Sequence, residues 1–315
     1  MAPFYKILEK EDIKLDVLED AQNGLRIEVA RNGSELISLQ RLQSGTKKWH
    51  PFLYRDGDVL PPKSGWGNHA TVMGYFLHRL WKEKSTYYGQ TIEGGNHGFL
   101  RHHLFKKPDV ESADGCHSLI YRVNVDEIPP RAYPLAVAFE LRYELSASGL
   151  RIEFSFENQE PERTAHVSFG LHPGFAVSSI ESAQIILPPG EYTRYMAPGN
   201  FLNGDTETIS HAGGKMPFDK KHLPDSYLIG LEGISKRMIT LQDTERGTEI
   251  NLDFSECPYL TLWSDHHPFI CIEPCWGLPD SNPPVAFDKK VGIQSIAPGK
   301  KLVKSFGINP KIIEN

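Results

Sequence analysis

Apolar and polar residues alternate with a period of two along most of the 315-residue chain. In the segment 136–145, AVAFELRYEL, apolar residues fall on every second position and charged residues stand between them. That pattern is typical of a strand with one buried face and one face in water. The short turn SASG leads into a second alternating segment, so residues 134–158 are predicted to form an antiparallel hairpin.

Further segments with alternating or short apolar runs are 24–30, 35–40, 117–128, 165–171, 183–188, 237–243, 248–254, 259–263, 269–274 and 301–308. No segment repeats apolar residues every three to four positions over a helix length, so helices are expected to be few and short. Glycine and proline are spread along the chain and do not mark a linker. The sequence therefore predicts a single all-β, mainly antiparallel domain over residues 1–315.

Composition narrows the choice of partner. Apolar residues make up 39% of the chain and charged residues 23%, as in an ordinary globular protein. The net charge is −6 and there is no lysine or arginine run, which argues against nucleic acid and against an anionic membrane surface. There is no signal-peptide pattern and no run near the roughly 18 apolar residues of a membrane span. We expect a cytoplasmic monomer or homodimer that acts on a small molecule.

Metal and cofactor motifs are missing from the sequence. The four cysteines, at 116, 257, 271 and 275, lack CxxC spacing, and neither HxH nor HExxH occurs. The stretch GWGNHA at 65–70 has GxGxxA spacing, but PPKS precedes it where a dinucleotide fingerprint requires a strand. We therefore expect reduced cysteines, no metal and no cofactor.

Three stretches gather histidine, arginine and carboxylate residues near predicted strand ends. They are 95–105 (GNHGFLRHHLF), 169–175 (FGLHPGF) and 269–280 (FICIEPCWGLPD). His172 precedes Pro173, which has no amide hydrogen, so the strand is predicted to end there and to leave the imidazole in a cleft. Glu273 closes an apolar run, and a buried carboxylate is costly unless it is paired or used.

In their order and spacing these stretches resemble the aldose 1-epimerase (galactose mutarotase-like) superfamily, most nearly its LacX-like members. The resemblance covers residues 74 to 307 and includes His-Gly-Phe-x-Arg at 97–101, His-Pro-x-Phe at 172–175, Trp-Ser at 263–264 and Glu-Pro-x-x-Gly-x-x-Asp at 273–280. Three features depart from the family pattern, and the first is Leu100, which stands where alanine is usual. Arg79 stands in LHRLWK where a Gly-Arg element is usual, and Gly174 follows His-Pro where a bulky residue is common.

The resemblance implies a large antiparallel β-sandwich of the supersandwich type, whose concave face carries a sugar site. It gives His172 the role of general acid and Glu273 that of general base, with His97 as a second histidine near the reacting centre. Arg79 and Asp225 match the groups that bind sugar hydroxyls. The implied activity is a cofactor-free sugar 1-epimerase, or mutarotase, which interconverts the α and β anomers of an aldose, most simply a hexose.

Other residues and functions stay open. Trp263 and Trp276 are candidates to stack on a sugar or to fill the core. A second possibility is a non-catalytic carbohydrate-binding or regulatory protein on the same fold. A third is a hexose-6-phosphate 1-epimerase, with Arg101 and the histidines after it near the phosphate. A hydrolase would need a second placed carboxylate, for which Asp225 and Asp280 are the candidates.

The residue types suit acid and base catalysis at neutral pH. A carboxyl group with a pKa of about 4.3 and a histidine with a pKa of about 6.5 can hold opposite protonation states there. On these ordinary values the rate is expected to follow a bell-shaped pH profile, with an acid limb from Glu273 and an alkaline limb from His172.

Overall fold

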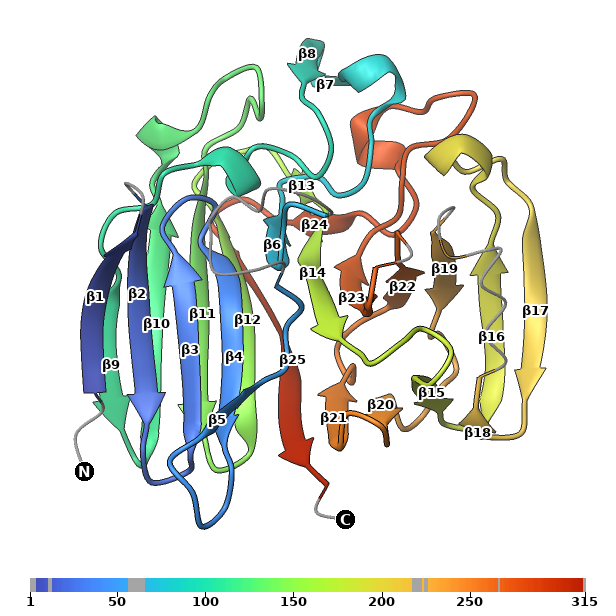
Figure 1. The fold of residues 1–315 in the computed structure, drawn as a ribbon. Helices are drawn as coiled ribbons and strands as arrows, with labels where there is room; N and C mark the ends of the chain where they lie inside the picture. The colour runs from blue at the N-terminus through green and yellow to red at the C-terminus, as the bar shows by residue number, and fades with distance from the viewer. Residues whose placement is uncertain are drawn as a thin grey trace.

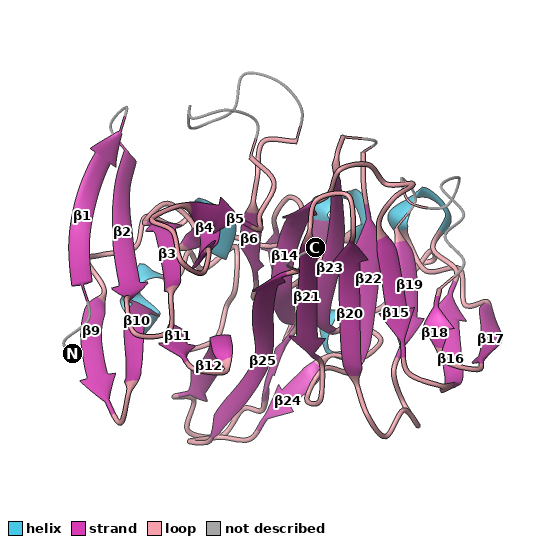
Figure 2. Cartoon of the chain, turned by 60° about the horizontal axis from the view of Figure 1, so that its bottom comes forward, coloured by secondary structure: helices cyan, strands magenta, loops and turns pink. Residues whose placement is uncertain are grey.

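The computed structural model describes residues 4–10, 13–55, 66–216, 223, 226–265 and 267–313. Its strands pair antiparallel in large sheets, and Figure 1 shows how little of the chain is helical. A five-stranded and a seven-stranded sheet lie side by side in one layer, and a nine-stranded sheet forms the other (Figure 2). The predicted antiparallel β-sandwich is confirmed.

The five-stranded sheet contains, in order, β1 (Phe4–Lys10), β2 (Ile13–Asp20), β3 (Leu25–Ala30), β4 (Glu35–Leu42) and β5 (Trp49–Pro51). The seven-stranded sheet contains β17 (Thr206–His211), β16 (Gly190–Tyr195), β19 (Tyr227–Gly230), β22 (Tyr259–Trp263), β23 (Phe269–Trp276), β14 (Phe169–Ala176) and β6 (Ala70–Met73). The nine-stranded sheet contains β18 (Gly214–Lys215), β15 (Gln184–Leu187), β20 (Met238–Asp243), β21 (Thr248–Asp253), β25 (Lys301–Ile312), β12 (Gly149–Asn158), β11 (Val137–Ser146), β10 (Cys116–Val123) and β9 (Asp109–Ala113).

Two short ribbons complete the strands: β13 (Ala165–Val167) with β24 (Gln294–Ile296), and β7 (Lys84–Tyr87) with β8 (Gln90–Glu93). Single 3-10 turns are η1 (Trp81–Glu83), η2 (Leu100–His102), η3 (Val125–Glu127), η4 (Pro198–Asn200) and η6 (Phe287–Lys289). Among the described residues no helix is long and apolar enough to cross a membrane.

The core lies between the two layers and follows the alternation seen in the sequence. Along β11 every second residue is buried, and its ladder with β12 confirms the predicted hairpin. Inward-facing residues of all three large sheets, such as Ile27, Phe139 and Phe169, join one apolar cluster. Strand alternation therefore directs one face of each sheet to this cluster and leaves the other face for water or for a site.

The strand that carries His172 does not end at the histidine, so that prediction is wrong. Strand β14 continues through Pro173 to Ala176 and pairs with β6 on one side, where the Gly174 N–H donates to the His69 carbonyl at 2.7 Å. On its other side the ladder with β23 is interrupted over residues 171–173. Backbone donors alternate between the two sides of a strand, so the missing amide of Pro173 faces this interruption and breaks no bond to β6.

This interruption places His172 across from Glu273. The pairs Gly170↔Cys275 and Gly174↔Cys271 flank it in one continuous register. If the same register continues through the interruption, His172 lies opposite Glu273. Each of the two residues is followed by a proline. Directly opposed side chains point to the same face of a sheet. The sheet itself therefore brings together two residues that lie 101 positions apart in the sequence.

Candidate active site

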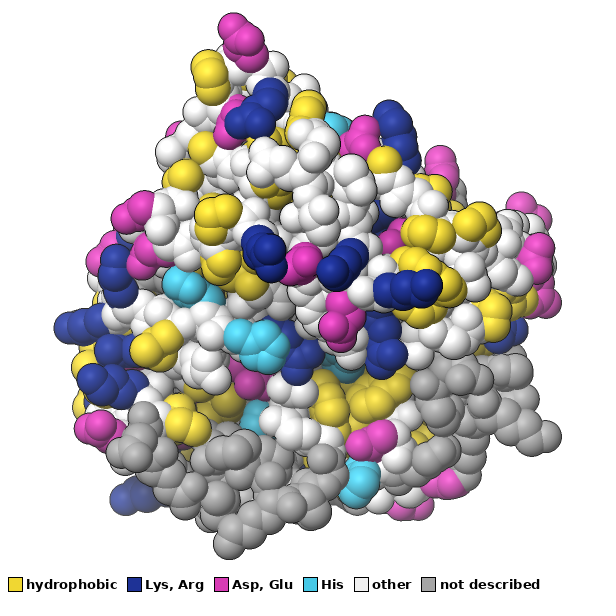
Figure 3. Space-filling model, turned by 90° about the horizontal axis from the view of Figure 1, so that it is seen from above, with side chains coloured by type: hydrophobic (Ala, Val, Ile, Leu, Met, Phe, Trp, Pro, Cys, Tyr) yellow, Lys and Arg dark blue, Asp and Glu magenta, His cyan; other side chains and the backbone are white. Residues whose placement is uncertain are grey.

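A cavity of about 370 Å³ lies at the His172–Glu273 pair. Its described lining consists of Trp66, Asn68, His78, Arg79, Asn96, His97, Arg101, His172, Asn200, Ser226, Trp263 and Glu273. Seen from above, histidine and basic side chains gather near the middle of the molecular face (Figure 3). The structure thus brings together six of the residues singled out from the sequence, while Trp276 lies elsewhere and Asp225 falls outside the described residues.

A larger hollow of about 480 Å³ lies on the solvent face of the nine-stranded sheet. Its lining includes Glu144, Arg151, Asp253 and Glu256 but no histidine. The smaller cavity is the better candidate because it combines convergent polar groups with buried titratable side chains.

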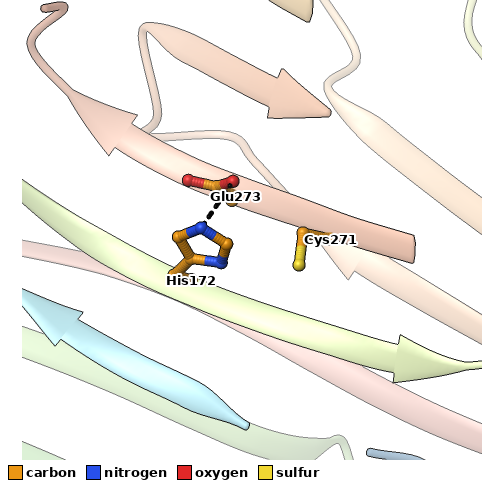
Figure 4. Close-up of side chains that lie close together, drawn as sticks. All are labelled: His172, Cys271 and Glu273. Carbon is orange, nitrogen blue, oxygen red and sulfur yellow. Dashed lines mark ion pairs between the residues drawn. The ribbon is translucent and has the colours of Figure 1, made fainter. Parts of the chain in front are cut away.

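His172 and Glu273 form a close, buried pair. Nε2 of His172 lies 3.3 Å from Oε1 of Glu273 (Figure 4), and the two residues are 9% and 1% exposed. The rings of Trp66 and Trp263 lie 4.8 and 5.6 Å from the His172 ring, measured between centroids. The indoles shield the pair from water, which strengthens electrostatic interactions within it.

Burial opposes charge on both members of the pair. It lowers the pKa of His172 to about 3 and raises the pKa of Glu273 well above its ordinary value, because a charged group loses its hydration in the interior. Between the lowered pKa of His172 and the raised pKa of Glu273 the pair therefore holds one exchangeable proton between Oε1 and Nε2. The neutral pair and the ion pair contain the same number of protons. In the neutral pair the exchangeable proton resides on Glu273, and in the ion pair it resides on His172, across the 3.3 Å contact.

His97 is fixed by the backbone of a tight loop. Its Nδ1 accepts the N–H of His78 at 3.2 Å, and its own N–H donates to the His78 carbonyl at 2.7 Å. Burial lowers the pKa of His97 well below its ordinary value, so the ring is neutral and its proton resides on Nε2. His97 is therefore a hydrogen-bond donor beside His172, with ring centroids 5.4 Å apart.

The loop after His97 depends on a glycine. Gly98 has a φ of 72°, and a Cβ there would lie 2.3 Å from the carbonyl oxygen of Gly74. No other residue fits this approach without moving the backbone. The glycine of the His-Gly-Phe-x-Arg element thus holds His97 at the cavity.

Trp66 lines the cavity and was not predicted from the sequence. Its ring stacks on Phe269 at 5.1 Å and crosses strand β14 at Gly174, where a Cβ would lie only 2.5 Å from the indole. Gly174, which departs from the usual family pattern, makes room for this tryptophan. The feature of the sequence that could have indicated the position of Trp66 is therefore the glycine at position 174.

Strained backbone gathers at the cavity. Of the nine described residues other than glycine with positive φ, four line it: His78, His97, Asn200 and Ser226. Such conformations cost about 1–3 kcal/mol each and cluster at functional sites. None of them shows in a hydrophobic pattern, so sequence periodicity missed His78, Asn200 and Ser226.

Two arginines supply positive charge to the lining. Arg79 is exposed, whereas Arg101 is half-buried and donates to Asn68 Oδ1 at 3.4 Å. Neither forms an ion pair with a carboxylate in the part of the chain that the structure describes. Glu273 is the single acidic residue of the described lining.

Comparison with known proteins identifies the family of this chain. The family model described as "Aldose 1-epimerase" matches residues 16–308. The chain belongs to the aldose 1-epimerase family. The plasmid and chromosomal LacX proteins of Lactococcus lactis subsp. lactis are each 29% identical over 200 residues. The match spans 59% of this chain and 64% of each LacX protein, which is less than two thirds of the relatives' length.

Solved structures show the same fold. A galactose mutarotase related enzyme from Lactobacillus acidophilus has a TM-score of 0.78 at 20% identity, with 99% of this chain and 100% of that chain covered. A galactose mutarotase-like protein from Lactobacillus casei has a TM-score of 0.76 at 22% identity, covering 98% and 100%. The galactose 1-epimerase from Lactobacillus acidophilus has a TM-score of 0.73 at 11% identity, covering 99% and 100%.

In this aldose 1-epimerase family member, Trp276 belongs to the core. It is fully buried, stacks on Phe169 at 4.9 Å and donates its indole N–H to the Glu256 carbonyl at 2.9 Å. It lies three positions after Glu273 in one strand, and alternation therefore directs the two side chains to opposite faces. The interpretation of Trp276 as a sugar-stacking residue gives way to that of a core residue, while Trp263 lines the cavity.

Trp276→Ala is expected to lower the free energy of unfolding by about 3–5 kcal/mol, because it empties a large buried volume. Urea unfolding followed by circular dichroism measures this loss. Trp263→Ala serves as the matched control, because its side chain is only half-buried and should cost less stability. A larger loss at Trp263 than at Trp276 would contradict the placement of the two indoles.

One group of described side chains has donor atoms close enough to hold a metal ion. One atom each of His172, Cys271 and Glu273 lies within 4.8 Å of the others (Figure 4). Burial raises the pKa values of the Cys271 thiol and the Glu273 carboxyl. A protonated thiol and a protonated carboxyl are poor ligands. Independence from metal stays a prediction.

EDTA is therefore expected to leave the rate of sugar anomer exchange unchanged. The comparison requires protein dialysed against chelator and the same protein after addition of Zn²⁺ or Mg²⁺. If activity disappears on dialysis and returns with a divalent ion, the trio holds a functional metal and the expectation is wrong.

Proposed function

We propose that this protein is an aldose 1-epimerase that interconverts the α and β anomers of an aldose without a cofactor. The observation that carries the proposal is the buried pair of His172 and Glu273, whose nitrogen and oxygen lie 3.3 Å apart at a cavity. A base and an acid placed side by side match the two proton transfers of ring opening. Family membership supports an isomerase on independent grounds.

The reaction uses the single exchangeable proton of the pair. In the productive form Glu273 is ionised and His172 carries the proton. Glu273 takes the proton of the C1 hydroxyl while His172 gives its proton to the ring oxygen, and the C1–O5 bond breaks to leave an open-chain aldehyde. Rotation about C1–C2 and the reverse transfers close the ring on the other face. Both oxygens are bonded to C1, so two groups a few ångströms apart reach both of them.

The remaining lining supports binding. His97 offers an Nε2–H donor near the reacting centre, and Arg79 and Arg101 offer donors to sugar oxygens. Trp263 and Trp66 present flat apolar surfaces suited to the C–H face of a sugar. Asp225 is retained as a proposed hydroxyl-binding residue.

Exchange NMR tests the proposal directly. Saturation of the α anomeric proton is followed at the β signal for D-glucose, D-galactose and other aldoses, with and without protein. We expect catalysed transfer for at least one of these sugars. Binding without acceleration for every sugar would establish the alternative of a non-catalytic carbohydrate-binding protein.

A phosphorylated hexose is a second candidate substrate. It is favoured by two arginines in the cavity lining that lack a described carboxylate partner. Arginine is well suited to phosphate because it donates two parallel hydrogen bonds. Comparing D-glucose with D-glucose 6-phosphate in the same exchange measurement decides between the two substrate classes through their kcat/KM values.

A further inference from the structure

The cavity wall at residues 66–69 has few backbone hydrogen bonds of its own. Trp66 and Asn68 line the cavity and are half-buried, and strand β6 begins only at Ala70. Among the described residues, hydrogen bonds between backbone groups reach this segment at His69 alone, whose carbonyl accepts the Gly174 N–H at 2.7 Å. A segment with so few bonds does not hold its side chains in place without further support.

Glu35, in the five-stranded sheet, holds this segment from outside. It is the first residue of β4, and its Oε1 accepts the backbone N–H of His69 at 2.5 Å. The same oxygen lies 3.4 Å from Nδ1 of His69. The side chains of His69 and Glu35 are 3% and 19% exposed, so the contact is largely shielded from water. A carboxylate acceptor makes this hydrogen bond stronger than a neutral acceptor would.

The turn before Glu35 also contacts the segment that carries Arg101. The Gly33 N–H donates to the His103 carbonyl at 2.7 Å. Burial lowers the pKa of Arg101, and the charge of Glu35 opposes this shift. The turn between β3 and β4 therefore lies against both segments whose side chains meet where Arg101 donates to Asn68.

The position of segment 66–69 affects the reacting pair through Trp66. The indole lies 4.8 Å from the His172 ring and stacks on Phe269 at 5.1 Å, measured between centroids. It thereby limits the orientations open to the imidazole, which lies 3.3 Å from Glu273. A displacement of about 1 Å in a catalytic group can lower a rate by about 10²-fold.

We infer that Glu35 is a positioning residue, which holds segment 66–69 at the cavity so that Trp66 fixes the His172 ring and Asn68 orients Arg101. This inference rests on the proposed function of the same cavity. Glu35 is not part of the described lining, so it acts through the backbone of His69 and touches no substrate. Any residue at position 69 other than proline supplies the donor, whereas only a side chain with an acceptor completes the bond at position 35.

The competing explanation is that Glu35 satisfies a buried N–H and contributes to stability alone. Its replacement would then lower the thermal stability and leave the kinetics of the folded protein unchanged. Leaving a buried N–H unpaired costs stability under either explanation. A change in stability therefore does not separate the two, and the position of Trp66 has to be observed directly.

The experiment follows the indole N–H signals in ¹H–¹⁵N spectra. The chain contains five tryptophans, and Trp66→Phe assigns the signal of Trp66. Glu35→Ala removes the acceptor, whereas Glu35→Gln keeps an amide oxygen in the same place. We expect Glu35→Ala to shift the Trp66 signal and to lower kcat/KM for anomer exchange by about 10- to 100-fold. Glu35→Gln should keep the wild-type signal and a kcat/KM within about threefold of wild type.

Glu160→Ala is the matched control, because Glu160 is also buried and accepts a backbone N–H, that of Ala136, at 2.8 Å. It is not part of the described cavity lining. We expect it to lower stability and to leave the Trp66 signal and kcat/KM unchanged.

An unshifted Trp66 signal in Glu35→Ala, or a kcat/KM within about twofold of wild type, overturns the inference. Glu35→Met fills the same space without an acceptor and replaces Glu35→Ala if the alanine variant does not fold. If neither variant folds, the role of Glu35 is structural and the inference is wrong. If wild-type protein exchanges no anomers, the proposed function fails, while the Trp66 signal still decides whether Glu35 holds the cavity wall.

Discussion

Glu273→Gln is expected to lower kcat for anomer exchange by about 10²- to 10⁴-fold, with KM changed by less than about threefold. Glutamine has nearly the same shape and can still contact Nε2 of His172, so the sheet and the cavity keep their geometry. It has no carboxylate to take the proton of the C1 hydroxyl. The loss therefore falls on proton transfer and leaves binding nearly intact.

Asp280→Asn is the matched control for this substitution, because it also exchanges a buried carboxyl for an amide. The Asp280 oxygens accept the backbone N–H groups of Trp81 and Ser281, and Asp280 does not line the cavity. We expect its effect on stability to exceed its effect on kcat. Equal kcat values for Glu273→Gln and wild type, measured by saturation transfer between the anomeric protons, would remove Glu273 from the mechanism.

The strands that carry His172 and Glu273 could be predicted from the sequence because each residue adjoins a clear strand pattern. Alternation over 165–171 and the apolar run over 269–272 identified the strands around His172 and Glu273. Antiparallel neighbours can place distant residues face to face. The register itself could not be predicted, because it depends on how β14 and β23 pair across the interruption near Pro173 and Pro274. A proline was taken as the end of a strand, whereas the fold tolerates it where one side lacks a ladder bond.

The rest of the lining lies outside any periodic pattern. Trp66, His78 and Asn200 come from irregular segments or short turns, and their positions depend on positive φ angles or on room left by a glycine. Strand β6, which pairs with β14 beside His172, is four residues long and fully buried, so it offers no alternation to detect. Trp276 shows the opposite case: alternation from Glu273 indicates the core, but the sequence analysis left Trp276 open as a sugar-stacking candidate.

His172→Asn is expected to lower kcat by about 10²- to 10⁴-fold. It should also change the alkaline part of the pH profile, so that kcat rises with pH where the wild-type kcat falls. In the proposed mechanism the wild-type pair works with one exchangeable proton. Adding a second proton creates a buried positive charge. The acid limb of the pH profile therefore lies near pH 3, because burial lowers the pKa of His172 to about 3. Removing the shared proton leaves a buried carboxylate. The alkaline limb of the pH profile therefore lies well above the ordinary pKa of a carboxyl group, because burial raises the pKa of Glu273.

The limbs are therefore assigned in the opposite order from that expected for the ordinary pKa values, with histidine on the acid side and the carboxyl on the alkaline side. Apparent values belong to the pair, since its two sites share one proton. Wild-type kcat should stay level between the two limbs and fall as pH rises through the raised pKa of Glu273.

In His172→Asn no acid remains, and Glu273 works only as an ionised base. Its residual rate should therefore rise with pH through the range in which the wild-type rate falls. Exchange NMR at a series of pH values, with the uncatalysed rate subtracted at each, measures both curves. If both fall together at alkaline pH, a group other than Glu273 governs that limb, and the shared-proton description of the pair is wrong.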